Sequence, residues 1–226
     1  MRIAEELRHP YSAAYALFHV AFLDVWRRDW SSVHERASQV LDIAEEHDYQ
    51  VWRALALIFL GVSEAALGRP AEGMALSDQG IARYQDLTTP PVFWPMLLSV
   101  RARGFGIAGR SEEGLEPVDQ AIDLMRGLDN VLFPQLPLVK GDLLAAASGA
   151  ADARGSFRDA FESAEAAGAR MWQLRAATRL TELRSASGEP ADEERAELRA
   201  VYETFAEESD TADLVDARLA LGDAGH

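Results

Sequence analysis

The sequence repeats one pattern about every 40 residues, and this period constrains the fold more than any other feature. Clusters of helix-breaking residues recur near Trp30, Pro70, Ser111, Ala151 and Pro190. The intervals between them are 40, 41, 40 and 39 residues. A spacing this regular indicates a chain of similar structural units rather than one irregular globular domain.

Aromatic residues give a second, independent marker of the same period. Trp52, Phe93, Phe133 and Trp172 are separated by 41, 40 and 39 residues. Two unrelated markers with the same spacing indicate a repeated structural unit. Such units stack on their neighbours, because a single unit cannot bury its own apolar face.

Each unit contains two stretches with helical periodicity, separated by a short turn. In one of them Leu55, Ile58, Phe59 and Val62 follow the i, i+3, i+4, i+7 spacing of a helix face. Glycine ends the first helix of a pair and proline can open the second. No stretch alternates polar and apolar residues as a strand would. The sequence therefore predicts an all-α fold, a right-handed solenoid of antiparallel helix pairs.

Small residues occupy positions where paired helices must approach closely. Gly61, Gly73 and Gly80 follow the spacing of small residues in tetratricopeptide repeats, which this pattern resembles. Pro117 departs from that pattern, because it falls inside a second helix and is expected to kink it.

The predicted organisation is a single tetratricopeptide-like domain over residues 1–226, with about five helix pairs. Residues 1–8 are expected to form a truncated helix, the end of a preceding second helix. A short capping helix is expected near 211–221.

Several segments resemble the C-terminal helical-repeat region of large bacterial signalling ATPases, of the adenylate cyclase-like or LuxR-type regulator kind. The segment Trp172–Thr178 is similar to the penultimate helix of that region, and Val201-Tyr202 with Phe205 and Asp213-Leu214 to its closing signature. The resemblance implies a sensing or scaffolding module, and the absence of cysteine fits a reducing, cytoplasmic location. In such proteins an ATPase module, with a cyclase or DNA-binding module, would precede the repeats.

Charge and composition exclude several kinds of partner. The chain has 37 acidic against 22 basic residues, a net charge of −15, which disfavours nucleic acid and anionic membrane surfaces. It has no cysteine, which excludes disulfides and thiolate zinc sites. No apolar run reaches the ~20 residues of a membrane helix.

The sequence has no catalytic, nucleotide-binding or metal-binding motif in the structural setting that such a motif requires. Gly104–Gly109 reads G-x-G-x-x-G, the pattern of dinucleotide-binding loops, but Gly109 falls on the period of helix-ending glycines. No phosphate-binding loop and no i, i+4 histidine pair occurs. We therefore predict no catalytic, cofactor-binding or metal-ligating residues, and no enzymatic activity.

Two columns of residues could bind a partner. Arg101, Lys140 and Arg179 are each 39 residues apart, which places them on successive first helices, where an aligned positive stripe could hold an acidic peptide. The alternative for these bases is ion pairing with nearby acids. The aromatic column of Trp52, Phe93, Phe133 and Trp172 could line a groove, although aromatics at repeat spacing more often pack between helices.

The function predicted from these features is a protein-interaction or regulatory scaffold of a bacterial signalling protein, with a peptide or partner domain on the concave face. The alternative is a small-molecule sensor whose apolar pocket is enclosed by the aromatic column.

Overall fold

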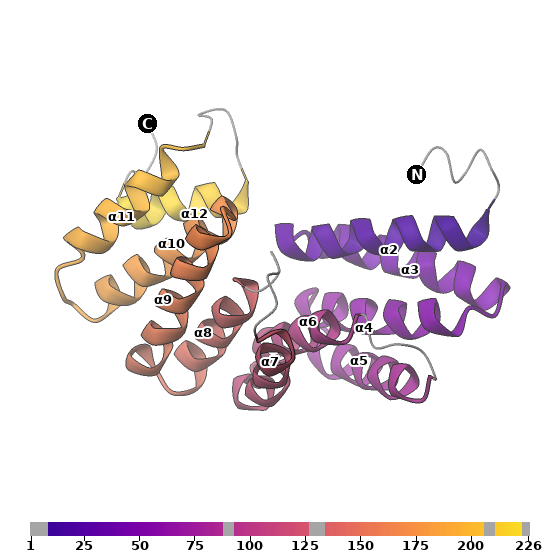
Figure 1. Ribbon diagram of the computed structural model, residues 1–226. Helices are drawn as coiled ribbons and strands as arrows, with labels where there is room; N and C mark the ends of the chain where they lie inside the picture. Colours follow the sequence, from indigo (N-terminus) through magenta and orange to yellow (C-terminus); the bar gives the residue numbers. More distant parts are fainter. Residues whose placement is uncertain (1–8, 88–92, 127–133, 206–210, 223–226) are drawn as a thin grey trace. The chain divides into compact units, whose positions relative to one another are not determined.

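The computed structural model of the chain describes residues 9–87, 93–126, 134–205 and 211–222 (Figure 1). Within these ranges every regular element is an α-helix, eleven in all, and consecutive helices pack together. The prediction of an all-α helical-repeat fold is confirmed. The chain divides into two compact units, Met1–Pro117 and Val118–His226. A single domain over residues 1–226 therefore stays a prediction.

Unit 1 is built from stacked antiparallel helix pairs. Each helix from α2 to α5 packs on the next, and α4 also contacts both α2 and α6. The first helices α2, α4 and α6 thus form one layer, with α3 and α5 beside it (Figure 1). The helices are α2 (Pro10–Arg27), α3 (Trp30–Glu46), α4 (Gln50–Ala66), α5 (Pro70–Gln85), α6 (Trp94–Ile107) and α7 (Ser111–Met125), within which the division between the units falls.

Unit 2 continues the same construction and ends in a shorter helix. Helix α9 packs on both α8 and α10, and α10 packs on α11. Helix α12 lies against α10 and α11, in the segment where a capping helix was expected. The expected truncated helix at 1–8 lies outside the described residues. The helices are α8 (Gln135–Ala147), α9 (Ala150–Ala166), α10 (Arg170–Ala186), α11 (Asp192–Tyr202) and α12 (Ala212–Leu221).

The 40-residue period is visible in the backbone. A residue with positive φ follows the first helix of five successive pairs, and four of the five are glycines. This left-handed conformation lets the last backbone carbonyls of a helix accept hydrogen bonds, and glycine adopts it without strain. The residues and their φ angles are Arg28 (60°), Gly68 (96°), Gly109 (72°), Gly149 (99°) and Gly188 (70°).

The G-x-G-x-x-G segment is part of a helix, as its place in the period suggested. Gly104 and Gly106 lie within α6, and Gly109 follows its C-terminal end. A Cβ atom at Gly104 would lie 2.9 Å from Cγ2 of Val62 on α4, so this glycine permits close helix packing. A dinucleotide loop needs a strand before its glycines, whereas here they follow Trp94 along one helix.

Helix α3 begins at a well-formed N-cap. The Asp29 carboxylate accepts hydrogen bonds from the Ser32 backbone N–H at 3.1 Å and from the Ser32 hydroxyl at 2.8 Å. The backbone hydrogen bond from Ser32 is the largest influence that lowers the pKa of Asp29 from its ordinary value, because it favours the ionised carboxylate. The cap fixes where the turn after α2 ends and the second helix begins.

Helices α4 and α5 approach so closely that no side chain fits between them at three positions. A Cβ atom at Gly61 would lie 2.5 Å from the Ser77 backbone nitrogen, and one at Gly73 would lie 2.6 Å from the Ala65 backbone nitrogen. A Cβ at Gly80 would meet Ile58 and the Ala54 carbonyl. The small residues recognised in the sequence therefore mark a backbone-to-backbone contact.

Gly61→Ala is expected to lower the free energy of unfolding of unit 1 by about 1–3 kcal/mol, because the added methyl group meets backbone atoms that can move only if α4 and α5 separate. Gly155→Ala is the matched control. It lies within α9 with nothing within 4 Å of an added Cβ, so alanine should stabilise unit 2 by about 0.5–1 kcal/mol. Urea denaturation followed by circular dichroism measures both. A neutral Gly61→Ala would contradict the close approach.

Candidate functional site

Arg101 lies on α6, the first helix of its pair, with its side chain 26% exposed. Its NH2 atom is 2.8 Å from Oδ1 of Asp78 on α5, a carboxylate that is 51% exposed. Its guanidinium also lies 5.2 Å from the centre of the Phe105 ring. The charge that was predicted to face a partner is thus held at the surface by one half-exposed aspartate.

Lys140 repeats this arrangement one pair later, in unit 2. Its Nζ on α8 is 2.7 Å from Oδ1 of Asp119 on α7, with the two side chains 32% and 51% exposed. As with Arg101, the base comes from a first helix and the acid from the second helix that precedes it.

Arg179 on α10 has two acidic partners. Its Nε lies 2.9 Å from Oδ1 of Asp142 on α8, and its NH1 lies 2.8 Å from Oε2 of Glu182. Burial of the guanidinium lowers its pKa, but attraction to Asp142 and Glu182 outweighs this and leaves the pKa above the ordinary value. Arg179 therefore keeps the positive charge that a partner carboxylate would need.

Arg101, Lys140 and Arg179 have the same kind of location and the same kind of ion-pair partner. All three lie on first helices, partly exposed, and each is paired with an aspartate of another helix. This is the geometry of the ion-pairing alternative. Exposed pairs of this kind contribute only ~0–1 kcal/mol, so an incoming carboxylate can replace the aspartate at little cost. Arg101 belongs to unit 1 and the other two to unit 2, so a continuous stripe stays a prediction.

The aromatic column is mainly buried where the structure describes it. Trp52 is 2% exposed and Trp172 is 8% exposed. Phe93 is half-buried and lies 5.6 Å from the Phe18 ring, measured between centroids. Phe133 lies outside the described residues. The described rings of the column pack between helices, which is the more common role of aromatic residues at repeat spacing. They do not form the wall of an open groove.

A surface that sequence reasoning missed lies on α2. Tyr11 and Tyr15 are 47% and 50% exposed. Their rings meet the buried Trp52 edge-on, with centroids 5.4 and 5.9 Å apart, and Tyr15 stacks on His19 at 4.1 Å. The sequence could have indicated this surface, because two tyrosines four residues apart lie on the same face of a helix. Tyrosine is enriched among the residues that contribute most to binding at protein interfaces.

A buried ion pair in unit 2 also went unpredicted. Arg175 on α10 and Asp213 on α12 are 8% and 6% exposed. The Arg175 Nε and NH2 atoms donate to Oδ1 and Oδ2 of Asp213 at 2.8 and 2.5 Å, and the guanidinium lies 4.8 Å from the centre of the Trp172 ring. This two-bond contact holds the last helix on α10.

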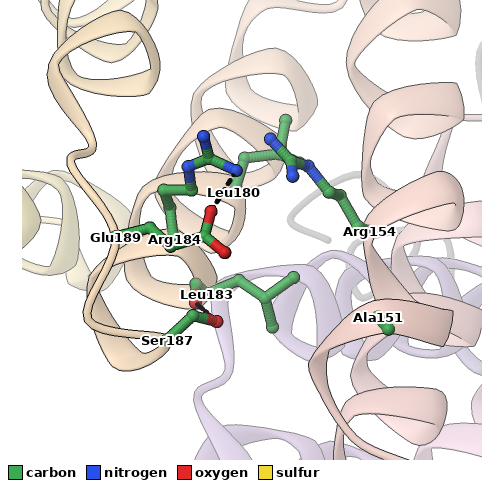
Figure 2. A pocket seen from close by; sticks show the side chains of 7 residues that line it. All are labelled: Ala151, Arg154, Leu180, Leu183, Arg184, Ser187 and Glu189. Atoms are coloured by element: carbon green, nitrogen blue, oxygen red, sulfur yellow. Dashed lines mark hydrogen bonds and ion pairs between the residues drawn. The ribbon is translucent and has the colours of Figure 1, made fainter.

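Unit 2 also contains a pocket of about 250 Å³ between α9, α10 and the turn that follows α10 (Figure 2). Its apolar lining includes Leu180 and Leu183, and Leu183 points into it in Figure 2. Arg154 from α9 and Arg184 from α10 stand on its two sides, and Glu189 pairs with Arg184. Neither Trp172 nor any other residue of the aromatic column lines it.

The described residues lack two other kinds of feature. They contain no group of three or more His, Asp or Glu side chains that could hold a metal ion. Among the helices described, none combines the length and the apolar character needed to cross a bilayer.

Comparisons with known proteins place the chain only loosely. No protein-family model matches it. It is similar to an uncharacterized protein of Rhizobium meliloti (strain 1021), with 28% identity over 118 residues. The match covers 52% of this chain and 11% of that protein. The chain thus resembles, over half its length, a small part of a much longer protein.

Proposed function

We propose that this chain is a protein-interaction or regulatory scaffold with no catalytic activity of its own, and that its first helices bind an acidic peptide or an acidic segment of a partner domain. One observation carries the proposal: Arg101, Lys140 and Arg179 project from first helices, and each is held by an aspartate that another carboxylate can replace. A partner would form two or three charge-assisted hydrogen bonds in place of those that the aspartates make.

The exposed tyrosines of α2 add an apolar component to the same layer of helices in unit 1. Tyr11 and Tyr15 offer ring faces and hydroxyl groups on a first helix, as Arg101 offers a charge on α6. A peptide that alternates acidic and apolar residues matches both features.

The proposed biological setting is a larger bacterial signalling protein. The resemblance to the repeat region of bacterial signalling ATPases suggests a cytoplasmic regulatory module that works beside an ATPase or effector module. The similarity to a stretch that makes up 11% of a longer bacterial protein agrees with a modular setting. The small-molecule alternative needs an apolar pocket lined by the aromatic column, whereas Trp52 and Trp172 are buried between helices.

The experiment replaces Arg101, Lys140 and Arg179 together by alanine. Fluorescence anisotropy with labelled ten-residue peptides that combine Asp or Glu with Leu and Phe should show binding to the native chain. The triple variant should bind the best of these peptides at least tenfold more weakly, because charge-assisted hydrogen bonds contribute ~1.5–3 kcal/mol each.

The matched control removes three other arginines, Arg27, Arg126 and Arg195, which are 72%, 74% and 41% exposed. It changes the net charge by the same amount and should leave the affinity within about twofold. Circular dichroism must show unchanged helicity in both variants. Equal loss in the two would mean that only net charge matters, and an unchanged affinity of the triple variant would remove these bases from the function.

A further inference from the structure

The pocket of unit 2 brings two guanidinium groups to one point. Arg154 NH2 lies 3.0 Å from Oε1 of Glu194, and Arg184 Nε lies 3.7 Å from the same oxygen. Glu194, in the first turn of α11, is 5% exposed. Because this carboxylate is buried between two bases, it is a fixed part of the structure and neutralises one of the two positive charges.

The second positive charge is neutralised by a group of a different kind. Arg184 NH1 lies 2.5 Å from Oε2 of Glu189, which stands in the turn after α10 with its side chain 54% exposed. Figure 2 shows this carboxylate reaching the Arg184 guanidinium at the rim of the pocket. Glu189 therefore occupies the place that a ligand carboxylate would take, and an exposed pair can be exchanged at a cost of only ~0–1 kcal/mol.

The rest of the lining suits an alkyl group. Leu180, which is 3% exposed, and the half-buried Leu183 form the apolar wall of the pocket. The volume of about 250 Å³ lies below the ~300–1,000 Å³ of pockets that hold drug-sized ligands, so the ligand is small. An apolar wall beside one exchangeable positive charge fits a molecule with one carboxylate and a short branched chain.

We propose that this pocket binds a small alkyl carboxylate, whose carboxylate replaces Glu189 on Arg184 while its alkyl chain lies against Leu180 and Leu183. The same chemistry is offered by a free short-chain acid and by the C-terminus of a peptide that ends in leucine. This site goes beyond the proposed function, because none of its residues is among the bases assigned to partner binding.

The first arm of the test is a titration of the full chain, followed by NMR chemical shifts. The probes are 4-methylpentanoate, 4-methylpentan-1-ol, and N-acetyl-Ala-Leu with a free or an amidated C-terminus. The acid should bind with a dissociation constant of about a millimolar, as expected for a ligand of its size, and the alcohol at least tenfold more weakly. If the peptide acid binds tighter than 4-methylpentanoate, the source is a peptide C-terminus. Weaker binding of the peptide identifies a free acid. Equal binding of acid and alcohol, or of neither, overturns the site.

The second arm uses variants with opposite expected effects. Arg184→Ala should weaken 4-methylpentanoate at least tenfold, whereas Arg126→Ala, which also removes an arginine paired with an exposed acid, should leave it unchanged. Glu189→Gln should tighten binding by about threefold, because it removes the competing charge and leaves the fold intact. Unchanged or weaker binding by Glu189→Gln overturns the exchange, even if Arg184→Ala fails to fold. The triple variant of Arg101, Lys140 and Arg179 should bind the acid normally, which separates this site from the proposed function.

Discussion

Asp213→Ala is expected to lower the free energy of unfolding of unit 2 by about 3–5 kcal/mol. The substitution removes both hydrogen bonds that the Arg175 guanidinium makes with this carboxylate, at 2.8 and 2.5 Å. Arg175 is 8% exposed and cannot recover the loss by turning into water. The cost is therefore mainly that of a buried positive charge deprived of its counterion, together with the looser attachment of α12 to α10.

Hydrogen exchange measured on peptides from α10 and α12 reports this loss where it arises, because the two units need not unfold together. Asp123→Ala is the matched control. This aspartate also pairs with an arginine, Arg126, but both side chains are at least 70% exposed, so the change should stay within about 0.5 kcal/mol.

The double variant Arg175→Met, Asp213→Leu tests the physical reason for the effect. It removes both charges and keeps apolar volume, so it should recover most of the stability that Asp213→Ala loses. A loss below 1 kcal/mol for Asp213→Ala would show that the pair is hydrated and that α12 is held by its apolar contacts alone.

The sequence predicted the features that depend on local conformation. Gly68, Gly109, Gly149 and Gly188 lie on the repeat period because each must follow a helix in the left-handed region, which is a property of a short segment. Gly61 and Gly73 were recognisable for a similar reason, since close helix packing within one pair recurs at a known spacing. All-α architecture follows from the same local signals.

The parts that could not be predicted depend on where distant side chains meet. Periodicity placed Arg101, Lys140 and Arg179 on first helices, but it did not tell which aspartates lie within 3 Å of them. Arg175 and Asp213 are 38 residues apart, and their pairing depends on how the last helix lies on α10, which repeat spacing does not determine.

The pocket also depends on residues that lie far apart in the sequence. Arg154 and Arg184 come from different helices and meet only because both reach Glu194 at the start of a third. Glu194 lies in a stretch rich in acidic residues, which is typical of a solvent-exposed helix, yet its side chain is only 5% exposed. A buried acid within an acidic surface helix has no signature in composition.

Trp172→Ala should lower the free energy of unfolding of unit 2 by about 3–5 kcal/mol, the usual cost of deleting a buried indole ring. The ring is 8% exposed and lies under the Arg175 guanidinium, 4.8 Å from its centre. Its removal leaves a cavity and also withdraws the aromatic face that helps to fix this guanidinium for its bonds with Asp213.

The measurement is again hydrogen exchange in α10 and α12, because Trp172 itself is lost as a fluorescent probe. Trp172→Phe keeps an aromatic face and most of the apolar contact, so its loss should be less than half as large. The combination of Trp172→Ala with Asp213→Ala should cost less than the sum of the two single losses, because both act through the position of one guanidinium. A loss below 1 kcal/mol for Trp172→Ala, with additive effects, would mean that the ring is dispensable for packing and free to face a ligand. In that case the aromatic column would regain its place as the wall of a small-molecule groove.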